Sequence, residues 1–261
     1  MIKLRKHYIY SMNKRKTTKQ VLNSIKNKIL DLMFPKDIKC CFCGEELNSQ
    51  AKNRTCVSCC EKLPFIKNPC LKCGSEMGNN TQGLCLKCSK NNMDFLLARA
   101  VFCYESRPMS MVRKVKYETA TQRIENMVDY MIECFNQHKL SADVITFVPM
   151  TERKEKWRGF NQSKLIAEEF AKRVQLPVVE TCKKIVDNES QTDLNFSKRK
   201  QNVKDNFKFV AECKSEIEGK IVLILDDVVT TGATVNEIAR ILKQNHAREC
   251  LVLSFAHTRI K

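Results

Sequence analysis

Two hydrophobic patterns alternate along the chain from residue 93 onward. Continuous apolar runs predict buried strands at 98–104, 144–148, 221–225 and 249–255, with a short strand near 177–179. Apolar positions at helical spacing predict helices at 109–117, 121–137, 162–174 and 234–244. Strands that alternate with helices are typical of a parallel sheet covered on both faces, so residues 93–261 are predicted to form an α/β domain.

Cysteines dominate the segment before this domain. Ten of the 15 cysteines lie between residues 40 and 88, and eight of them form four CxxC pairs: Cys40/Cys43, Cys56/Cys59, Cys70/Cys73 and Cys85/Cys88. Two CxxC turns supply the four thiolates of a closed tetrahedral zinc site. Structural zinc can contribute roughly 10 to 16 kcal/mol of folding free energy to a segment too small to bury a core of its own. We therefore predict two structural zinc sites in residues 38–92.

The cysteine spacing leaves the ligand set partly open. Cys41 and Cys60 adjoin cysteines of the CxxC pairs and could replace them as ligands. The four pairs could share ions as neighbours or in a nested order, and we expect neighbouring pairs to share an ion. We also expect the module to serve as a scaffold, because a closed four-thiolate site has no open position for a substrate. Contact with nucleic acid is the alternative role.

Positive charge is concentrated before the cysteine-rich segment. The chain has a formal net charge of +17, and residues 1–39 carry 11 Lys and Arg against 2 Asp and Glu. Within an arm of residues 1–37, the apolar residues of 17–33 recur at helical spacing opposite lysines, which predicts an amphipathic helix. This arm is either a docking helix with a solvated lysine face or an electrostatic contact with nucleic acid.

Neither a membrane helix nor a secretory signal is visible in the sequence. No apolar run approaches the roughly 18 residues that a membrane helix needs, and the first residues lack an apolar h-region. We therefore expect a cytoplasmic protein.

Acidic and small residues follow the predicted strand at 221–225. Asp226 and Asp227 come directly after it, and a turn of small residues precedes the next helix: Thr230, Thr231, Gly232, Ala233 and Thr234. Amides and hydroxyls of such a turn can surround a phosphate at a helix N-terminus, and ligands of parallel sheets bind at the carboxyl ends of the strands. The two carboxylates would repel a phosphate, so they are better suited to sugar hydroxyls or to a ligand that carries Mg²⁺. A ligand with a phosphate and a ribose is implied.

Residues 222–234, VLILDDVVTTGAT, match the phosphoribosyl pyrophosphate (PRPP) motif of type I phosphoribosyltransferases. More of the chain resembles the ComF family of competence proteins, through CxxCG at 40–44, VKY at 115–117, RGFNQS at 158–163 and QTDLNFSKRKQNV at 191–203. The resemblance implies a double zinc ribbon followed by a type I phosphoribosyltransferase-like domain. It also implies PRPP with Mg²⁺ as ligands, and a role with other competence machinery in the uptake and handling of incoming single-stranded DNA.

The resemblance also implies roles for individual residues. Asp226 and Asp227 would hold the ribose hydroxyls, and the turn at 230–234 would hold the 5′-phosphate. A loop after the strand at 144–148 would face the diphosphate with three cations: Arg153, Lys154 and Arg158. The stretch 187–203 resembles the loop that closes over PRPP in these enzymes.

The expected catalytic residues are Asp226, Asp227, Arg158, Lys198 and Arg199. The sequence departs from the family at Met150 and Thr151, beside the expected diphosphate loop.

Three functions fit this sequence. The chain could be a DNA-handling protein of the ComF type, an enzyme that moves ribose 5-phosphate from PRPP to an unknown nitrogenous acceptor, or a regulator that senses PRPP. Phosphoribosyl transfer needs no nucleophile from the protein, because the acceptor attacks the sugar. Trp157 could stack on a base or anchor its loop, and His138, His246 and His257 are expected at the surface or at strand edges.

Overall fold

The computed structural model describes residues 39–78, 83–118, 120–186 and 206–259. The basic arm and the stretch 187–203, including Lys198 and Arg199, lie outside these ranges. The predictions made for them therefore stay predictions. None of the helices in the described part of the chain combines the length and the hydrophobicity that a membrane crossing requires.

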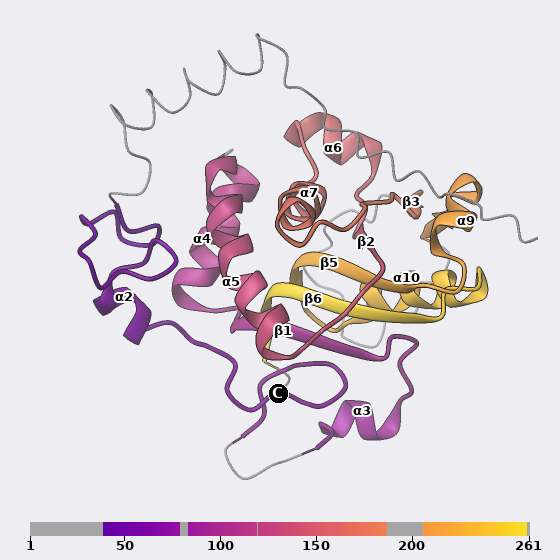
Figure 1. The fold of residues 1–261 in the computed structure, drawn as a ribbon, viewed down its shortest axis with the longest axis horizontal. Helices are drawn as coiled ribbons and strands as arrows, with labels where there is room; N and C mark the ends of the chain where they lie inside the picture. The colour runs from indigo at the N-terminus through magenta and orange to yellow at the C-terminus, as the bar shows by residue number, and fades with distance from the viewer. Residues whose placement is uncertain (1–38, 79–82, 119, 187–205, 260–261) are drawn as a thin grey trace, which may run out of the picture.

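A parallel sheet forms the centre of the larger domain (Figure 1). Its strands are β1 (Leu97–Cys103), β2 (Val144–Phe147), β5 (Ile221–Val229) and β6 (Glu249–His257), in the order β1-β6-β5-β2. All three neighbouring pairs are parallel. Nearly every residue of β5 and β6 is buried, as the continuous apolar runs predict for central strands covered on both faces.

Helices cover both faces of this sheet. One face packs against α4 (Ser106–Tyr117), α5 (Ile124–Gln137) and α7 (Gln162–Val174), and the other packs against α10 (Ala233–Gln244). The 3₁₀ turn η1 (Thr121–Arg123) leads into α5, and η2 (Ala211–Cys213) with α9 (Lys214–Ile217) leads toward β5. This architecture confirms the predicted α/β class with a parallel sheet.

Three parts of the domain differ from the sequence-based expectation. The segment expected as a loop after β2 is a helix, α6 (Glu152–Arg158), which begins at the cap Thr151 and ends at Gly159. The strand expected to end at residue 225 continues to Val229, so Asp226 and Asp227 lie within it. The expected strand near 177–179 is one parallel bridge between Val178 and Ile145.

A small antiparallel pair of strands was not expected. It joins β3 (Cys182–Lys184) to β4 (Phe207–Phe209), with Cys182 opposite Phe209. The two strands belong to the segments that flank residues 187–205, and their pairing brings those segments together.

The cysteine-rich module contains two short helices, α2 (Val57–Glu61) and α3 (Leu86–Lys90). Its second half packs on the domain through β1. The backbone N–H of Ala98 donates to the carbonyl of Lys72 at 2.7 Å, and Arg99 donates to the carbonyl of Leu71 at 3.1 Å. Cys70 and Cys73 join the apolar core that α10 covers. The module and the sheet therefore share a packed boundary.

Gly74 lies at the closest approach of this boundary. Its φ is +73°, and a Cβ built there would lie 2.5 Å from the carbonyl oxygen of Ala98. Gly44 occupies the equivalent position in the first half, with φ of +81° and nothing within 4 Å of a built Cβ. Only glycine adopts such φ values without strain, and only at Gly74 is a side chain also excluded by backbone.

This difference predicts unequal effects of two alanine substitutions. Both Gly44→Ala and Gly74→Ala introduce φ strain, but Gly74→Ala adds a clash with β1. We expect Gly74→Ala to lower the free energy of unfolding by about 1–3 kcal/mol more than Gly44→Ala. Denaturant unfolding of both variants at matched zinc content measures this difference. Equal losses would contradict the close approach.

Candidate functional site

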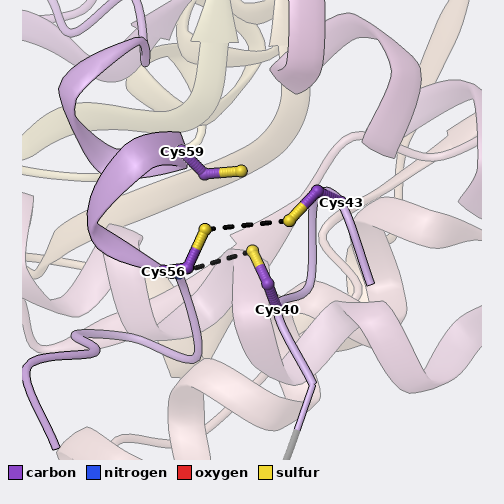
Figure 2. A group of neighbouring side chains, drawn as sticks. All are labelled: Cys40, Cys43, Cys56 and Cys59. Atoms are coloured by element: carbon purple, nitrogen blue, oxygen red, sulfur yellow. Dashed lines mark hydrogen bonds between the residues drawn. The ribbon is translucent and has the colours of Figure 1, made fainter. Parts of the chain in front are cut away.

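The eight cysteines of the CxxC pairs form two clusters of four. One contains Cys40, Cys43, Cys56 and Cys59, and the other contains Cys70, Cys73, Cys85 and Cys88. Within each cluster the sulfur atoms lie within 4.8 Å of one another. Figure 2 shows the four sulfurs of the first cluster gathered between the first CxxC turn and α2. Neighbouring pairs therefore share a site, as expected.

The sulfur geometry fits a tetrahedral zinc ion. Four ligands at the usual Zn–S distance of about 2.3 Å lie about 3.8 Å from one another. The Sγ atoms of Cys43 and Cys56 are 3.7 Å apart, and those of Cys73 and Cys85 are 3.8 Å apart. Two structural zinc ions would be held by these clusters and would supply the cross-links that the small module lacks.

Backbone N–H groups stabilise the thiolate form of one cysteine in each cluster. The N–H of Cys56 donates to Cys40 Sγ at 3.4 Å, and the N–H of Cys85 donates to Cys70 Sγ at 3.3 Å. Burial alone would raise the pKa of Cys40, but these and neighbouring backbone bonds lower it to about 6. The same balance lowers the pKa of Cys70 to about 7. Thiolates are the form that binds zinc.

The two remaining cysteines of the module lie outside both clusters. Cys41 is buried, and its sulfur lies 3.4 Å from the hydroxyl of Thr55. Burial raises the pKa of Cys41 to about 11, which disfavours a thiolate. Cys60 is half-buried on α2 and is not part of either group of four. The geometry therefore favours the eight CxxC cysteines over Cys41 and Cys60 as the metal-binding groups.

Asp226 and Asp227 are buried together near the carboxyl end of β5, with exposed fractions of 9% and 5%. Ser163 Oγ at the start of α7 donates to Asp226 Oδ1 at 2.8 Å, and the N–H of Asp227 donates to the same oxygen at 2.9 Å. Lys116 Nζ at the end of α4 lies 2.7 Å from Asp227 Oδ2. Three elements far apart in sequence therefore converge on this pair.

The two carboxyl groups experience different environments. Burial and the negative charge of Asp227 together raise the pKa of Asp226 to about 8, against the opposing effects of the hydrogen bond from Ser163 and the charge of Lys116. Burial alone would lower the pKa of Lys116, but the carboxylate of Asp227 outweighs it, and the net shift is upward. Lys116 thus stays charged beside Asp227, while Asp226 tends to hold its proton. A protonated carboxyl group and an ionised carboxylate therefore lie side by side.

The turn after β5 forms the start of α10. Gly232 is the N-cap residue with φ of +76°, and the Thr231 hydroxyl accepts from the N–H of Ala233 at 3.3 Å. Thr258, directly after β6, braces the turn: its N–H donates to the Val229 carbonyl at 3.0 Å and its hydroxyl to the Thr230 carbonyl at 3.2 Å. The first-turn amides of a helix have no intrahelical acceptor, so this turn can take an anion.

Of the three cations expected to face a diphosphate, Arg158 is linked to the carboxylates. It lies at the end of α6, and its Nη1 donates to Gln162 Oε1 at 2.7 Å. Gln162 Nε2 in turn donates to Asp227 Oδ2 at 3.5 Å. The Arg158 guanidinium also lies over the ring of Tyr117, 5.6 Å from its centroid.

Arg153 and Lys154 lie on α6 rather than in a loop. Arg153 lines a pocket of about 600 Å³ between α6 and β3, together with Glu152, Glu155, Glu180 and Lys183. The structure links Arg158 through Gln162 to Asp227, with the 230–234 turn directly after the same strand, and places Arg153 beside the pocket between α6 and β3. Lys154 lies in the first turn of α6, where its N–H donates to the Thr151 hydroxyl at 3.4 Å.

The expectation for His257 was wrong, and the structure separates the two roles considered for Trp157. His257 is buried with an exposed fraction of 2%, because β6 continues to this residue, and its Nδ1 lies 2.6 Å from the Thr258 carbonyl oxygen. Burial lowers the pKa of His257, and nearby Lys87 lowers it further, so the ring is neutral. Trp157 is 75% exposed, which disfavours the anchoring role and leaves stacking on a base as the open alternative.

Sequence reasoning assigned no role to Lys116, Gln162 and Ser163, which contact the carboxylates. Ser163 and Gln162 lie within the RGFNQS stretch, and Asn161 of the same stretch is the N-cap of α7. Its Oδ1 accepts from the N–H groups of Ser163 and Lys164, at 3.0 and 3.3 Å. The cap fixes the first turn of α7, and that turn aims both side chains at β5.

Comparison with known families matches both halves of the chain. A double zinc ribbon domain model matches residues 29–100, and a phosphoribosyl transferase domain model matches residues 161–258. The first model covers both cysteine clusters. The second covers α7, the carboxylate pair and the 230–234 turn.

Three relatives are similar to this chain. Competence protein F of Haemophilus influenzae is 26% identical over 84% of this chain and 97% of its own length. Competence protein ComFC of Bacillus subtilis is 25% identical over 72% of this chain and 78% of its own length. DNA utilization protein YhgH of Escherichia coli is 33% identical over 44% of this chain, and that match spans half of its length.

The sheet, the cysteine clusters and both family matches define a phosphoribosyltransferase-domain protein with a double zinc ribbon. The chain belongs to the ComF family of competence proteins. The resemblance seen in the sequence is thus confirmed.

The cluster assignment predicts different zinc contents for two neighbouring serine variants. Cys59→Ser removes a ligand of the first cluster, whereas Cys60→Ser changes a cysteine outside it. We expect Cys59→Ser to lose one of two zinc ions per chain and Cys60→Ser to keep both. Elemental analysis of the purified variants after dialysis measures this. A loss of zinc in Cys60→Ser would contradict the assignment.

Proposed function

We propose that this chain binds PRPP together with Mg²⁺ at the carboxyl end of β5, and that this site serves the handling of incoming single-stranded DNA in the cytosol during natural competence. The observation that carries the PRPP half is the pairing of Asp226 and Asp227 with the anion-binding turn at 230–234. The names of the relatives support the DNA half.

The carboxylate pair suits ribose hydroxyls. The polar contacts of the pair use Asp226 Oδ1 and Asp227 Oδ2, and within the described residues the other oxygen of each carboxyl group takes no hydrogen bond or ion pair. Two hydroxyls of a ribose can donate to two adjacent carboxyl groups. Ser163 and Lys116 hold these groups in place before the ligand arrives, which reduces the entropy lost on binding.

The 5′-phosphate of the ligand suits the turn. The turn at 230–234 starts three residues after Asp227, directly after β5, and leads into α10. A phosphate there would meet N–H groups with no intrahelical acceptor, the hydroxyls of Thr230 and Thr234, and the positive end of the helix dipole. Gly232 allows the backbone to approach the phosphate closely.

The diphosphate and its metal ion would lie on the Arg158 side of the carboxylates. Carboxylate oxygens are ligands that Mg²⁺ accepts, so Asp226 and Asp227 fit a metal-bearing ligand. Mg²⁺ would neutralise charge on the diphosphate when it is bound. Arg158 is held by Gln162 near this place, and a guanidinium can bind two phosphate oxygens at once. Lys198 and Arg199 would add further cations.

Calorimetric titration of the zinc-loaded protein with PRPP and Mg²⁺ tests the PRPP half. We expect micromolar binding that Asp226→Asn and Asp227→Asn each weaken at least tenfold, while Glu216→Gln, at an exposed position of α9, leaves it unchanged. Asn resembles the protonated form that Asp226 favours, so Asp226→Asn should fold even if Asp227→Asn leaves Lys116 without its partner. No binding by the wild type, or equal binding by all variants, would contradict this proposal.

Binding of a single-stranded oligonucleotide in a salt series tests the DNA half. The affinity of a strand held by its phosphates falls with salt, with a slope of roughly −0.7 per neutralised phosphate. Because residues 1–39 carry much of the positive charge, we expect the slope to flatten when residues 1–23 are removed. Fluorescence anisotropy measures both slopes. A protein that binds no strand at low salt would refute this half, and an unchanged slope would exclude the arm as the contact.

A further inference from the structure

The second zinc cluster touches the 230–234 turn through a lysine. Lys87 lies on α3, between the cluster cysteines Cys85 and Cys88. Its Nζ donates a hydrogen bond to the carbonyl oxygen of Thr231. The two residues are 144 positions apart, so only the docking of the ribbon on the domain brings them together. Lys87 places a cation at the turn that was proposed to hold the 5′-phosphate.

The contact acts on a particular peptide group. The carbonyl of Thr231 and the N–H of Gly232 belong to one planar trans peptide, in which they point in opposite directions. An ammonium that holds the carbonyl therefore fixes the direction of the Gly232 N–H. Withdrawal of electron density by the cation also polarises this N–H and makes it a better donor to an anion. Lys87 thus influences the turn from the side opposite the one where a ligand would bind.

A second set of contacts ties the same ribbon to α10. Asn91 Nδ2, directly after α3, donates to the Lys87 carbonyl at 2.9 Å. Three residues later, the N–H of Asp94 donates to Asn236 Oδ1 at 2.7 Å, and Asn236 Nδ2 donates to Asp94 Oδ2 at 2.7 Å. Asn236 lies in the first turn of α10, and its N–H donates to the Gly232 carbonyl at 2.9 Å. The ribbon and the residues directly after it therefore contact both the turn and the first turn of α10.

We propose that Lys87 is a positioning residue for the phosphate-binding turn, and that the second zinc cluster, by fixing α3, is a working part of that anion site. The proposal rests on the proposed function, because it takes the 5′-phosphate of a ribose phosphate as the ligand. It assigns unequal roles to the two clusters. The second cluster acts on ligand binding, and the first cluster, Cys40/Cys43/Cys56/Cys59, does not.

Calorimetry with ribose 5-phosphate and with PRPP plus Mg²⁺ tests the role of Lys87. Both ligands carry the 5′-phosphate, so Lys87→Ala should weaken both by the same factor, about tenfold or more, because the turn loses the cation that orients and polarises the Gly232 N–H. Lys87→Arg should recover most of the affinity because it keeps the cation. Lys90→Ala, at an exposed position on the same helix, should change neither, and all three variants should keep two zinc ions.

Two cysteine variants test the role of the cluster. Cys88→Ser should weaken ribose 5-phosphate binding as much as Lys87→Ala does, whereas Cys59→Ser, in the first cluster, should leave it within twofold of the wild type. Zinc content and circular dichroism show whether each variant loses only the zinc of the altered cluster while the rest of the protein stays folded. Equal effects of Cys88→Ser and Cys59→Ser would overturn the unequal roles.

The outcomes separate this inference from the proposed function. If the wild type binds PRPP, Asp226→Asn does not, and Lys87→Ala binds as the wild type does, the proposed function holds and the role of Lys87 is refuted. If the wild type binds neither ligand, the proposed function fails and the inference fails with it. A loss in Lys87→Ala that Lys87→Arg does not recover would reduce Lys87 to a packing contact.

Discussion

Two adjacent carboxyl groups are buried at the end of the most central region of the sheet, and the surrounding elements are arranged to hold them. A buried charge is costly unless it is paired and hydrogen-bonded. The ion pair with Lys116 and the hydroxyl of Ser163 supply these partners, from the end of α4 and from the first turn of α7. A sheet built for stability alone would place apolar residues here, because replacing a buried ion pair with packed hydrophobic residues is often neutral or stabilising. The cost of burying the pair is consistent with the binding role proposed for it.

The N-terminal module also depends on a few specific side chains, the cysteines of its two clusters. Residues 39–92 offer little apolar surface, and metal cross-links would take the place of a core. Once held by metal, the second ribbon is rigid enough to pack a glycine against the backbone of β1 and to hold Lys87 against Thr231. A module that was expected to be a scaffold thereby reaches the turn after the carboxyl end of β5. Its position there depends on ligands that lie only two residues before and one residue after Lys87 in the chain.

The sequence predicted those parts of the structure that rest on local patterns. The continuous apolar runs gave the strands of the parallel sheet, and the CxxC spacing gave two clusters of neighbouring pairs. Prediction from the sequence failed where a feature depends on tertiary structure rather than on a local pattern. Residues 152–158 form a helix in which none is buried, so no apolar periodicity revealed it, although Thr151 and Gly159 were available as cap signals. His257 was misplaced because β6 runs two residues beyond its predicted end. Lys116 and Lys87 act across long sequence distances, and nothing local to either residue signals its partner.

Hydrogen exchange of the zinc-loaded protein with and without PRPP and Mg²⁺ tests most directly whether the carboxyl end of β5 is the binding site. The account predicts that bound ligand slows exchange of the amides at 226–236 and in the first turn of α7, and leaves the amides of α2 unchanged. Protection centred instead on the pocket between α6 and β3, with none at 226–236, would contradict it.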